Sequence, residues 1–246
     1  MLEAVLFDWG DTLMEFTYAP ELVEAGHRAG LEAVGREDLP DVSVLAARFR
    51  ERYEPLFWAP GTVEEIEYPG LVRQLFGDFG IEISDEELAR FLEAEHAAWE
   101  PARRLAPATH GLLEALRSRG LKLGLVSNAF DPGWLLHRDL ERMGLAERLD
   151  FAVFSSEVGK RKPHRAIFDR ALEALGVASE RALFVGDRLY EDVRGAAEVG
   201  MLTVQALWFR ADEHPEGAEP DFQAFTQLDV LNVVARLLET PRRASA

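Results

Sequence analysis

An unbroken apolar run near the start of the chain, Ala4 to Phe7, ends at Asp8 and is followed by Gly10, Asp11 and Thr12. Because no polar residue interrupts the run, it predicts a strand buried on both faces, as in a parallel sheet. Open α/β sheets bind their ligands at the carboxyl ends of such strands. Asp8 is therefore a candidate site residue, although a turn that merely ends a strand would use the same residue types.

The second half of the chain alternates between strand and helix patterns. Strands that alternate with helices of ordinary length imply right-handed βαβ units. The predicted fold is an α/β, doubly wound, Rossmann-like parallel sheet. Its further strands are expected at 121–128, 151–156, 182–187 and 201–206, and its helices near 109–119, 134–143, 163–175, before 200 and at 228–238.

The carboxyl ends of parallel strands share one edge of a sheet, so residues far apart in the sequence meet there. Four of the predicted strands end in polar residues, namely Asp8, Ser127–Asn128, Ser155–Ser156 and Gly186–Asp187. The sequence therefore predicts one polar edge that receives a carboxylate from each half of the chain.

Residues 16–104 show helical periodicity and no clear strand. Ser84 followed by Glu87 is typical of a capping box that opens a helix. We therefore predict two domains: an α/β core of residues 1–15 and 105–246, and a helical cap, residues 16–104, inserted after the loop of Asp8. The aromatic residues of the cap stand at helical spacing, which favours a bundle core over a ligand cage; they are Phe49, Tyr53, Phe57, Trp58, Phe76 and Phe79.

The composition excludes several classes of protein. A net charge of −17 argues against binding nucleic acid, whose phosphates are bound by basic surfaces. There is no run of about 18 apolar residues and no basic N-terminal segment, so we predict a cytoplasmic protein that does not enter a membrane. Without cysteine, carboxylates, histidine and backbone oxygens are left as metal ligands. The oligomeric state stays open.

The polar edge has the groups that handle a phosphate monoester. Mg²⁺ prefers oxygen ligands and usually takes one or two protein carboxylates, which Asp8 and Asp187 can supply. A carboxylate such as Asp8 can also attack phosphorus and form an aspartyl-phosphate that water cleaves. Lys162 would offset the negative charge, and Ser127 with neighbouring amides would hold the phosphate oxygens.

These residues belong to four short motifs. In their order and spacing the chain resembles the haloacid dehalogenase-like (HAD) hydrolase superfamily, in the subgroup with a helical cap inserted after the first motif. The resemblance covers residues 1–13 and 105 to about 206. The motifs are FDWGDTL with Asp8 and Thr12, LVSN with Ser127, SSEVGKRKPHRAIF with Lys162, and VGDRLYEDVRGA with Gly186, Asp187 and Asp192.

The resemblance implies a role for each of the central residues. Asp8 would be the nucleophile and a metal ligand, and the backbone oxygen of Gly10 and the carboxylate of Asp187 would complete the protein ligands of Mg²⁺. Lys162 would pair with Asp8 and with the phosphate. Lys160 is its rival for that role, but Lys162 stands next to the proline that the motif requires.

The resemblance also implies supporting residues. Ser127 and Asn128 would bind the phosphate of the substrate. Asp192 would orient neighbouring groups or water. Thr12 and Asp11 would hold the metal ligands in place from the next layer of residues.

One position departs from the family's pattern. Phosphatases of this family carry a second Asp two residues after the nucleophile, where this chain has Gly10. That Asp protonates the leaving group and then activates water, which is general acid–base catalysis worth about 10²–10⁴ in rate. We do not assume that Asp11 replaces it, because a shift of one residue in a loop turns the side chain elsewhere.

Three functions are compatible with this loss. The first, which we predict, is a Mg²⁺-dependent phosphatase of a small phosphorylated metabolite that acts through an aspartyl-phosphate at Asp8. It would favour good leaving groups or borrow an acid from the cap, such as Glu15 or His27. The second is a carbon–halogen hydrolase, whose halide leaves without a proton. The third is a catalytically impaired protein that binds phosphate or a partner. The pair Gly186–Asp187 favours the first over the second, since dehalogenases of this family work without metal.

Overall fold

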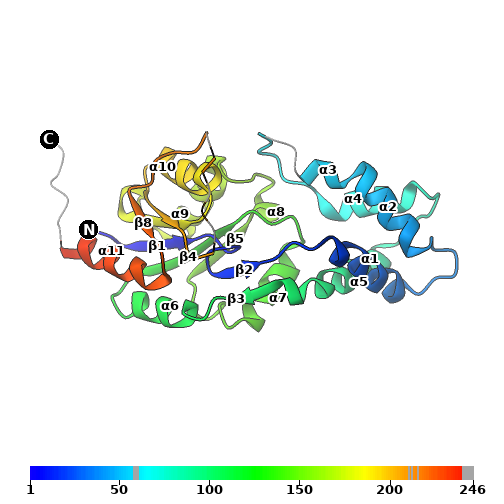
Figure 1. The fold of residues 1–246 in the computed structure, drawn as a ribbon, viewed down its shortest axis with the longest axis horizontal. Helices are drawn as coiled ribbons and strands as arrows, with labels where there is room; N and C mark the ends of the chain where they lie inside the picture. The colour runs from blue at the N-terminus through cyan, green and yellow to red at the C-terminus, as the bar shows by residue number, and fades with distance from the viewer. Residues whose placement is uncertain (58–60, 210, 212, 215, 240–246) are drawn as a thin grey trace.

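A computed structural model describes residues 1–57, 61–209, 211, 213–214 and 216–239. It contains a six-stranded sheet in the order β5-β4-β1-β6-β7-β8, with all neighbouring strands parallel and helices on both faces (Figure 1). The predicted doubly wound α/β fold is confirmed. The strands are β1 (Ala4–Phe7), β4 (Lys122–Ser127), β5 (Phe151–Phe154), β6 (Ala182–Gly186), β7 (Leu202–Ala206) and β8 (Phe222–Ala224).

The uninterrupted apolar run of β1 is explained by helices that cover both faces of the sheet. Val5 and Phe7 lie in one buried cluster, beneath α6 (Thr109–Arg117), α7 (Gly133–Arg142) and α11 (Gln227–Glu239). Ala4 and Leu6 lie in the opposite cluster, beneath α9 (Arg165–Leu175) and α10 (Gly195–Glu198). A polar residue within β1 would face a core on either side.

The strand order places β1 between β4 and β6, and this arrangement decides where the polar strand ends meet. Phe7 is in register with Leu125 of β4 and with Val185 of β6. The backbone N–H of Asp8 donates to the carbonyl of Val185, with 2.9 Å between the atoms. The chain segments that follow β1, β4 and β6 therefore start side by side.

The helical insertion, residues 20–98, shows five helices in its described parts, 20–57 and 61–98, and lies beyond the strand ends in Figure 1. Its helices share a buried cluster that also includes Leu135 of α7. It is connected to the sheet through an antiparallel pair of short strands, β2 (Met14–Phe16) and β3 (Arg103–Leu105). The short helix η1 (Glu100–Ala102) directly precedes β3. None of the described helices is long and apolar enough to span a membrane. The helices are α1 (Pro20–Val34), α2 (Val42–Arg52), α3 (Glu54–Phe57), α4 (Tyr68–Gly77) and α5 (Asp85–Ala98).

Several local predictions were wrong. The strands β2, β3 and β8 were not predicted, because each has only three residues and too short a pattern to be distinguished from a loop. The predicted strand 151–156 ends at Phe154, and Ser155 instead begins the short helix α8 (Ser155–Val158). The carboxylate of Glu157 accepts a hydrogen bond from the N–H of Phe154 at 3.0 Å, which starts the helix there. By contrast, the helix predicted before residue 200 is present as α10, and a π-helical turn, η3 (Leu189–Arg194), leads into it.

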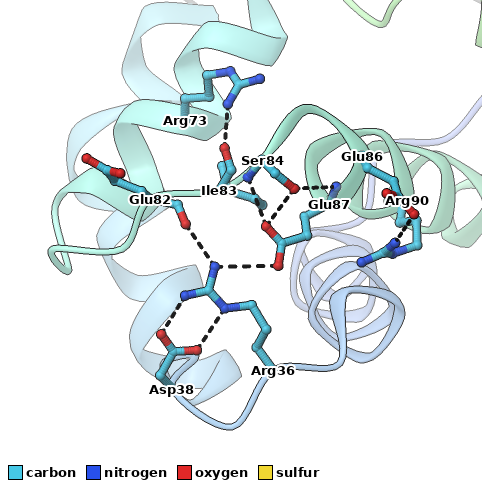
Figure 2. A network of polar contacts seen from close by, with 9 residues as sticks. All are labelled: Arg36, Asp38, Arg73, Glu82, Ile83, Ser84, Glu86, Glu87 and Arg90. Atoms are coloured by element: carbon cyan, nitrogen blue, oxygen red, sulfur yellow. Dashed lines mark hydrogen bonds and ion pairs between the residues drawn. The ribbon is translucent and has the colours of Figure 1, made fainter.

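A polar network fastens the start of α5 to the end of α1 (Figure 2). The predicted capping box is present, because the N–H of Ser84 donates to the Glu87 carboxylate at 2.8 Å and the Ser84 hydroxyl accepts from the N–H of Glu87 at 3.3 Å. Arg36 donates to the carbonyl of Glu82 at 2.8 Å and pairs with Asp38. The network holds the α4–α5 connection against the chain that follows α1.

Replacing Ser84 with alanine is expected to lower the free energy of unfolding by about 1 kcal/mol, because the first turn of α5 loses its capping oxygen. Urea denaturation followed by circular dichroism measures the change. Ser118→Ala is the matched control, since Ser118 is exposed after the last turn of α6, and its effect should stay within about 0.5 kcal/mol. Equal effects of the two changes would contradict the capping role of Ser84.

Candidate active site

Three carboxylates meet where β1 and β6 end. Asp8 follows β1, whereas Asp187 and Asp192 follow β6, the latter from within η3. One oxygen of each side chain lies within 4.8 Å of the others, and all three residues are buried. The two acids that the sequence predicted to meet, Asp8 and Asp187, are thus brought together from opposite halves of the chain.

Lys162 is the cation of this cluster. Its Nζ lies 2.5 Å from Oδ1 of Asp8 and 2.6 Å from Oδ1 of Asp192. Its backbone is held by Asn128, whose Oδ1 accepts from the Lys162 N–H at 2.7 Å and whose Nδ2 donates to the Lys162 carbonyl at 3.2 Å. Lys160, the rival, instead pairs with Glu64 of the helical insertion.

The electrostatics of the cluster favour a bound cation. Of the three buried carboxylates, Asp8 and Asp192 pair with the buried ammonium of Lys162, and Asp187 lies 3.6 Å from the partly exposed guanidinium of Arg188. Burial, together with the nearby charge of Asp8, raises the pKa of Asp192 to about 6, in spite of its ion pair. Although burial opposes it, the charges of Asp192 and Asp8 hold the pKa of Lys162 above its ordinary value. An oxygen-rich cluster with excess negative charge has the donor set that Mg²⁺ requires.

The loop after Asp8 has room where the family's second acid would stand. Gly10 lines the cavity described below, and a Cβ atom built on it would meet no other atom within 4 Å. Asp11 has a left-handed backbone conformation, with φ of 54°, and its Oδ1 accepts from the N–H of Phe16 at 3.1 Å. Thr12 is fully buried beneath the site, where its carbonyl accepts from Nε1 of Trp208 at 2.9 Å.

A cavity of about 530 Å³ separates the cluster from the helical insertion. Its floor includes Asp8, Lys162 and Asp187, with Ser127 and Asn128 beside them. Its opposite wall is rich in aromatic side chains from β2 and the insertion, namely Phe16, Tyr18, Phe49, Phe57, Tyr68 and Trp99.

The predicted aromatic core of the insertion is confirmed only in part. Tyr53 and Phe76 are buried in the helical cluster, and Phe79 packs against it. Phe49 and Phe57 pack there too, but they also line the cavity. Helical spacing could not separate these roles, because one helix face serves both the core and the cavity. Trp58 lies outside the described residues.

The insertion also contacts the core directly beside Lys162. The carbonyl of Val63 accepts from the N–H of Arg161 at 2.9 Å, and the N–H of Glu65 donates to the carbonyl of Gly159 at 3.1 Å. The Glu65 carboxylate further accepts from the hydroxyl of Ser155. Residues 63–65 and 159–161 therefore form a clasp on one side of the cavity.

The two cap residues considered as substitute acids do not fit that role. The carboxylate of Glu15 pairs with Arg104, and Glu15 is absent from the cavity wall among the described residues. His27 does line the cavity, but its burial lowers its pKa to about 4, so it is neutral at pH 7. A neutral imidazole of such low pKa is a poor proton donor.

Sequence reasoning missed Glu95, a buried residue of α5 that lines the cavity. Burial raises its pKa to about 8, so that its carboxyl is largely protonated at pH 7. A signal was present, since Glu95 follows Leu88, Phe91 and Leu92 on the apolar face of the helix. An acidic residue at such a position requires a special environment.

Comparison with known proteins places this chain in a family. A family model described as a haloacid dehalogenase-like hydrolase matches residues 2–200. Glyceraldehyde 3-phosphate phosphatase of Methanopyrus kandleri is 31% identical over 96% of this chain and 99% of its own length. Phosphoserine phosphatase of Thermus thermophilus is 31% identical over 90% of this chain and 95% of its own length. The crystal structure of 2-haloacid dehalogenase from Pseudomonas syringae superposes with a TM-score of 0.67 and 25% identity, covering 96% of this chain and 100% of that one.

Proposed function

Because this chain belongs to the haloacid dehalogenase-like hydrolase family, we propose that it is a Mg²⁺-dependent phosphatase of a small phosphorylated metabolite. The observation that carries the proposal is the buried ion pair of Lys162 and Asp8, which lies beside two further carboxylates on the floor of the cavity. The two relatives named as phosphatases act, by their names, on phosphate monoesters, which supports the same reaction here.

In the proposed reaction a carboxylate oxygen of Asp8 attacks phosphorus, and the bond from phosphorus to the ester oxygen breaks. The ester oxygen leaves with the electron pair, and water then hydrolyses the aspartyl-phosphate to release inorganic phosphate. Lys162 offsets the charge of the nucleophile and the phosphoryl group. Ser127 and Asn128 bind the phosphoryl oxygens, and Asn128 also holds the backbone of Lys162.

Asp8, Asp187 and the backbone oxygen of Gly10 would hold Mg²⁺. The ion supplies positive charge that neutralises the phosphate and orients it. Asp192 positions the lysine from the other side, and its Oδ2 accepts from the N–H of Arg188 at 2.9 Å. Asp11 and Thr12 support the loop that carries these ligands.

We further propose that residues 16–104 act as a cap domain over a core of residues 1–15 and 105–246. The aromatic wall faces the carboxylates across the cavity, so the cap contacts the part of the substrate that lies beyond the phosphate. Such a cap excludes water during the reaction and selects the leaving group.

Phosphate release from para-nitrophenyl phosphate and acetyl phosphate tests the function. We expect release with Mg²⁺ and its loss in EDTA, because the carboxylates repel the phosphate without the ion. Re-addition of Mg²⁺ should restore the rate, and circular dichroism in EDTA is the control for folding. Undiminished release in EDTA would contradict the proposed role of the metal.

Carbon–halogen hydrolysis is the second candidate, favoured by Gly10 and by the structural similarity to a 2-haloacid dehalogenase. Halide release from 2-haloacids, measured in parallel and unaffected by EDTA, would replace the phosphatase proposal. Retained Mg²⁺ binding without turnover of any phosphate ester or haloacid would favour a protein that binds phosphate or a partner.

A further inference from the structure

Glu95 presents one carboxyl oxygen to the cavity. Its Oε1 accepts from the hydroxyl of Tyr68 at 2.7 Å and lies 3.3 Å from Nε2 of His27. Its Oε2 has no hydrogen-bond partner in the described part of the chain, and it is not among the oxygens sealed from solvent. Since Glu95 lines the cavity, Oε2 is open to a ligand there.

The groups around Glu95 keep it uncharged at pH 7. Its burial raises its pKa to about 8, helped by Asp131 from the segment after β4 and opposed by the hydrogen bond from Tyr68 of α4 and by His96. His27 of α1 is neutral, and Tyr68 keeps its proton because burial raises its pKa well above the ordinary value. With Oε1 accepting from Tyr68, the proton of the acid belongs on Oε2, which can donate it in a hydrogen bond.

Among the described residues, the cavity wall offers no unpaired cation to an anionic leaving group. Each charged basic side chain described on its wall already has a carboxylate partner, and a carboxylate buried without a counter-charge is costly. The pairs are Lys162 with Asp8 at 2.5 Å, Arg103 with Asp139 at 2.6 Å, His96 with Asp131 at 3.1 Å, Arg188 with Asp187 at 3.6 Å and Arg161 with Glu65 at 3.8 Å.

We propose, as a refinement that rests on the phosphatase function, that Glu95 determines specificity: its Oε2 hydroxyl donates a hydrogen bond to an uncharged oxygen of the leaving group. The preferred substrates are then phosphate monoesters whose alcohol part carries hydroxyl or carbonyl groups and no carboxylate. The aromatic wall packs against the carbon skeleton of the same part.

Two matched pairs of substrates test this selectivity. In the first pair, glyceraldehyde 3-phosphate carries an aldehyde where 3-phosphoglycerate carries a carboxylate. In the second pair, 4-(hydroxymethyl)phenyl phosphate carries a hydroxymethyl group where 4-carboxyphenyl phosphate carries a carboxylate. With Mg²⁺ at pH 7 we expect kcat/KM to favour the neutral member of each pair at least about tenfold, the value of one hydrogen bond. The aryl pair needs no proton donor at position 10, so its ratio of kcat/KM values does not depend on the missing acid.

Three variants separate recognition from mere structural support. Glu95→Leu should bring the members of each pair to within about threefold, chiefly through KM, since the donor is lost. Glu95→Gln retains a donor at the same place, so it should keep the preference. Glu93→Leu is the matched control, because Glu93 is an exposed residue of the same helix and lies off the cavity among the described residues.

The pH profile gives a readout that a structural role would not change. Above pH 8 the native carboxyl loses the proton that it donates, so kcat/KM for the neutral esters should fall relative to Glu95→Gln, which has no such group. Three outcomes would overturn the inference and leave the phosphatase function intact. They are equal kcat/KM for both members of each pair in the native protein, an equal loss of kcat/KM for both members in Glu95→Leu, and the same fall of kcat/KM above pH 8 in Glu95→Gln. Failure to hydrolyse any phosphate ester would remove both.

Discussion

Asp8→Asn is expected to lower phosphate release by a factor on the order of 10⁴ or more, as loss of a nucleophile does in other enzymes that form covalent intermediates. The amide has the size of the carboxylate, so the loop keeps its shape, but it is a poor nucleophile and loses the charge that pairs with Lys162. Release of phosphate from acetyl phosphate with saturating Mg²⁺ measures the effect.

Asp169→Asn is the control for this change, because Asp169 pairs with Arg165 in the exposed face of α9. Its activity should equal that of the native protein, and circular dichroism should show both variants folded. If folded Asp8→Asn kept more than a tenth of the native rate, another group would have to be the nucleophile.

Gly10→Asp is expected to increase turnover of alkyl phosphates by about 10²–10⁴-fold, the usual contribution of general acid–base catalysis. The position can accept the side chain, since a Cβ atom there meets nothing within 4 Å and the residue does not have the left-handed backbone that glycine favours. The new carboxyl would protonate the departing alkoxide, which otherwise leaves with its full charge. Steady-state kinetics with glycerol 3-phosphate measures the gain.

Gly10→Asn separates proton donation from simple contact, because it adds the same volume without an ionisable group. Gly10→Asn should show no such gain. For para-nitrophenyl phosphate, whose leaving group needs no proton, the ratio of the turnover rates of Gly10→Asp and Gly10→Asn should approach one. A folded Gly10→Asp variant with unchanged turnover of alkyl esters would contradict our interpretation of this position.

The meeting of Asp8 and Asp187 was predictable, because the carboxyl ends of parallel strands lie at the same edge of a sheet. Once the apolar runs before Asp8 and Asp187 are assigned to one sheet, their ends must share an edge. The choice of Lys162 over Lys160 followed from the neighbouring proline, and the structure agrees with it, since Lys162 pairs with Asp8 whereas Lys160 pairs with Glu64.

The cavity wall was not predictable in the same way. Whether Phe49 and Phe57 face a core or a ligand depends on how α2 and α3 sit above the sheet, which helical periodicity does not encode. Glu95 was missed for a related reason, because its protonated state is created by burial between three helices and by the nearby Asp131. The helix pattern shows that Glu95 lies on the apolar face of α5, but it does not show which residues of other elements surround its carboxyl group.

The clasp between residues 63–65 and 159–161 has a consequence for the position of Lys162. Because Lys162 follows directly after the clasped segment, the hydrogen bonds from the insertion also hold the peptide that brings its ammonium to Asp8. The insertion is thereby linked to the candidate nucleophile through the backbone as well as through the wall of the cavity.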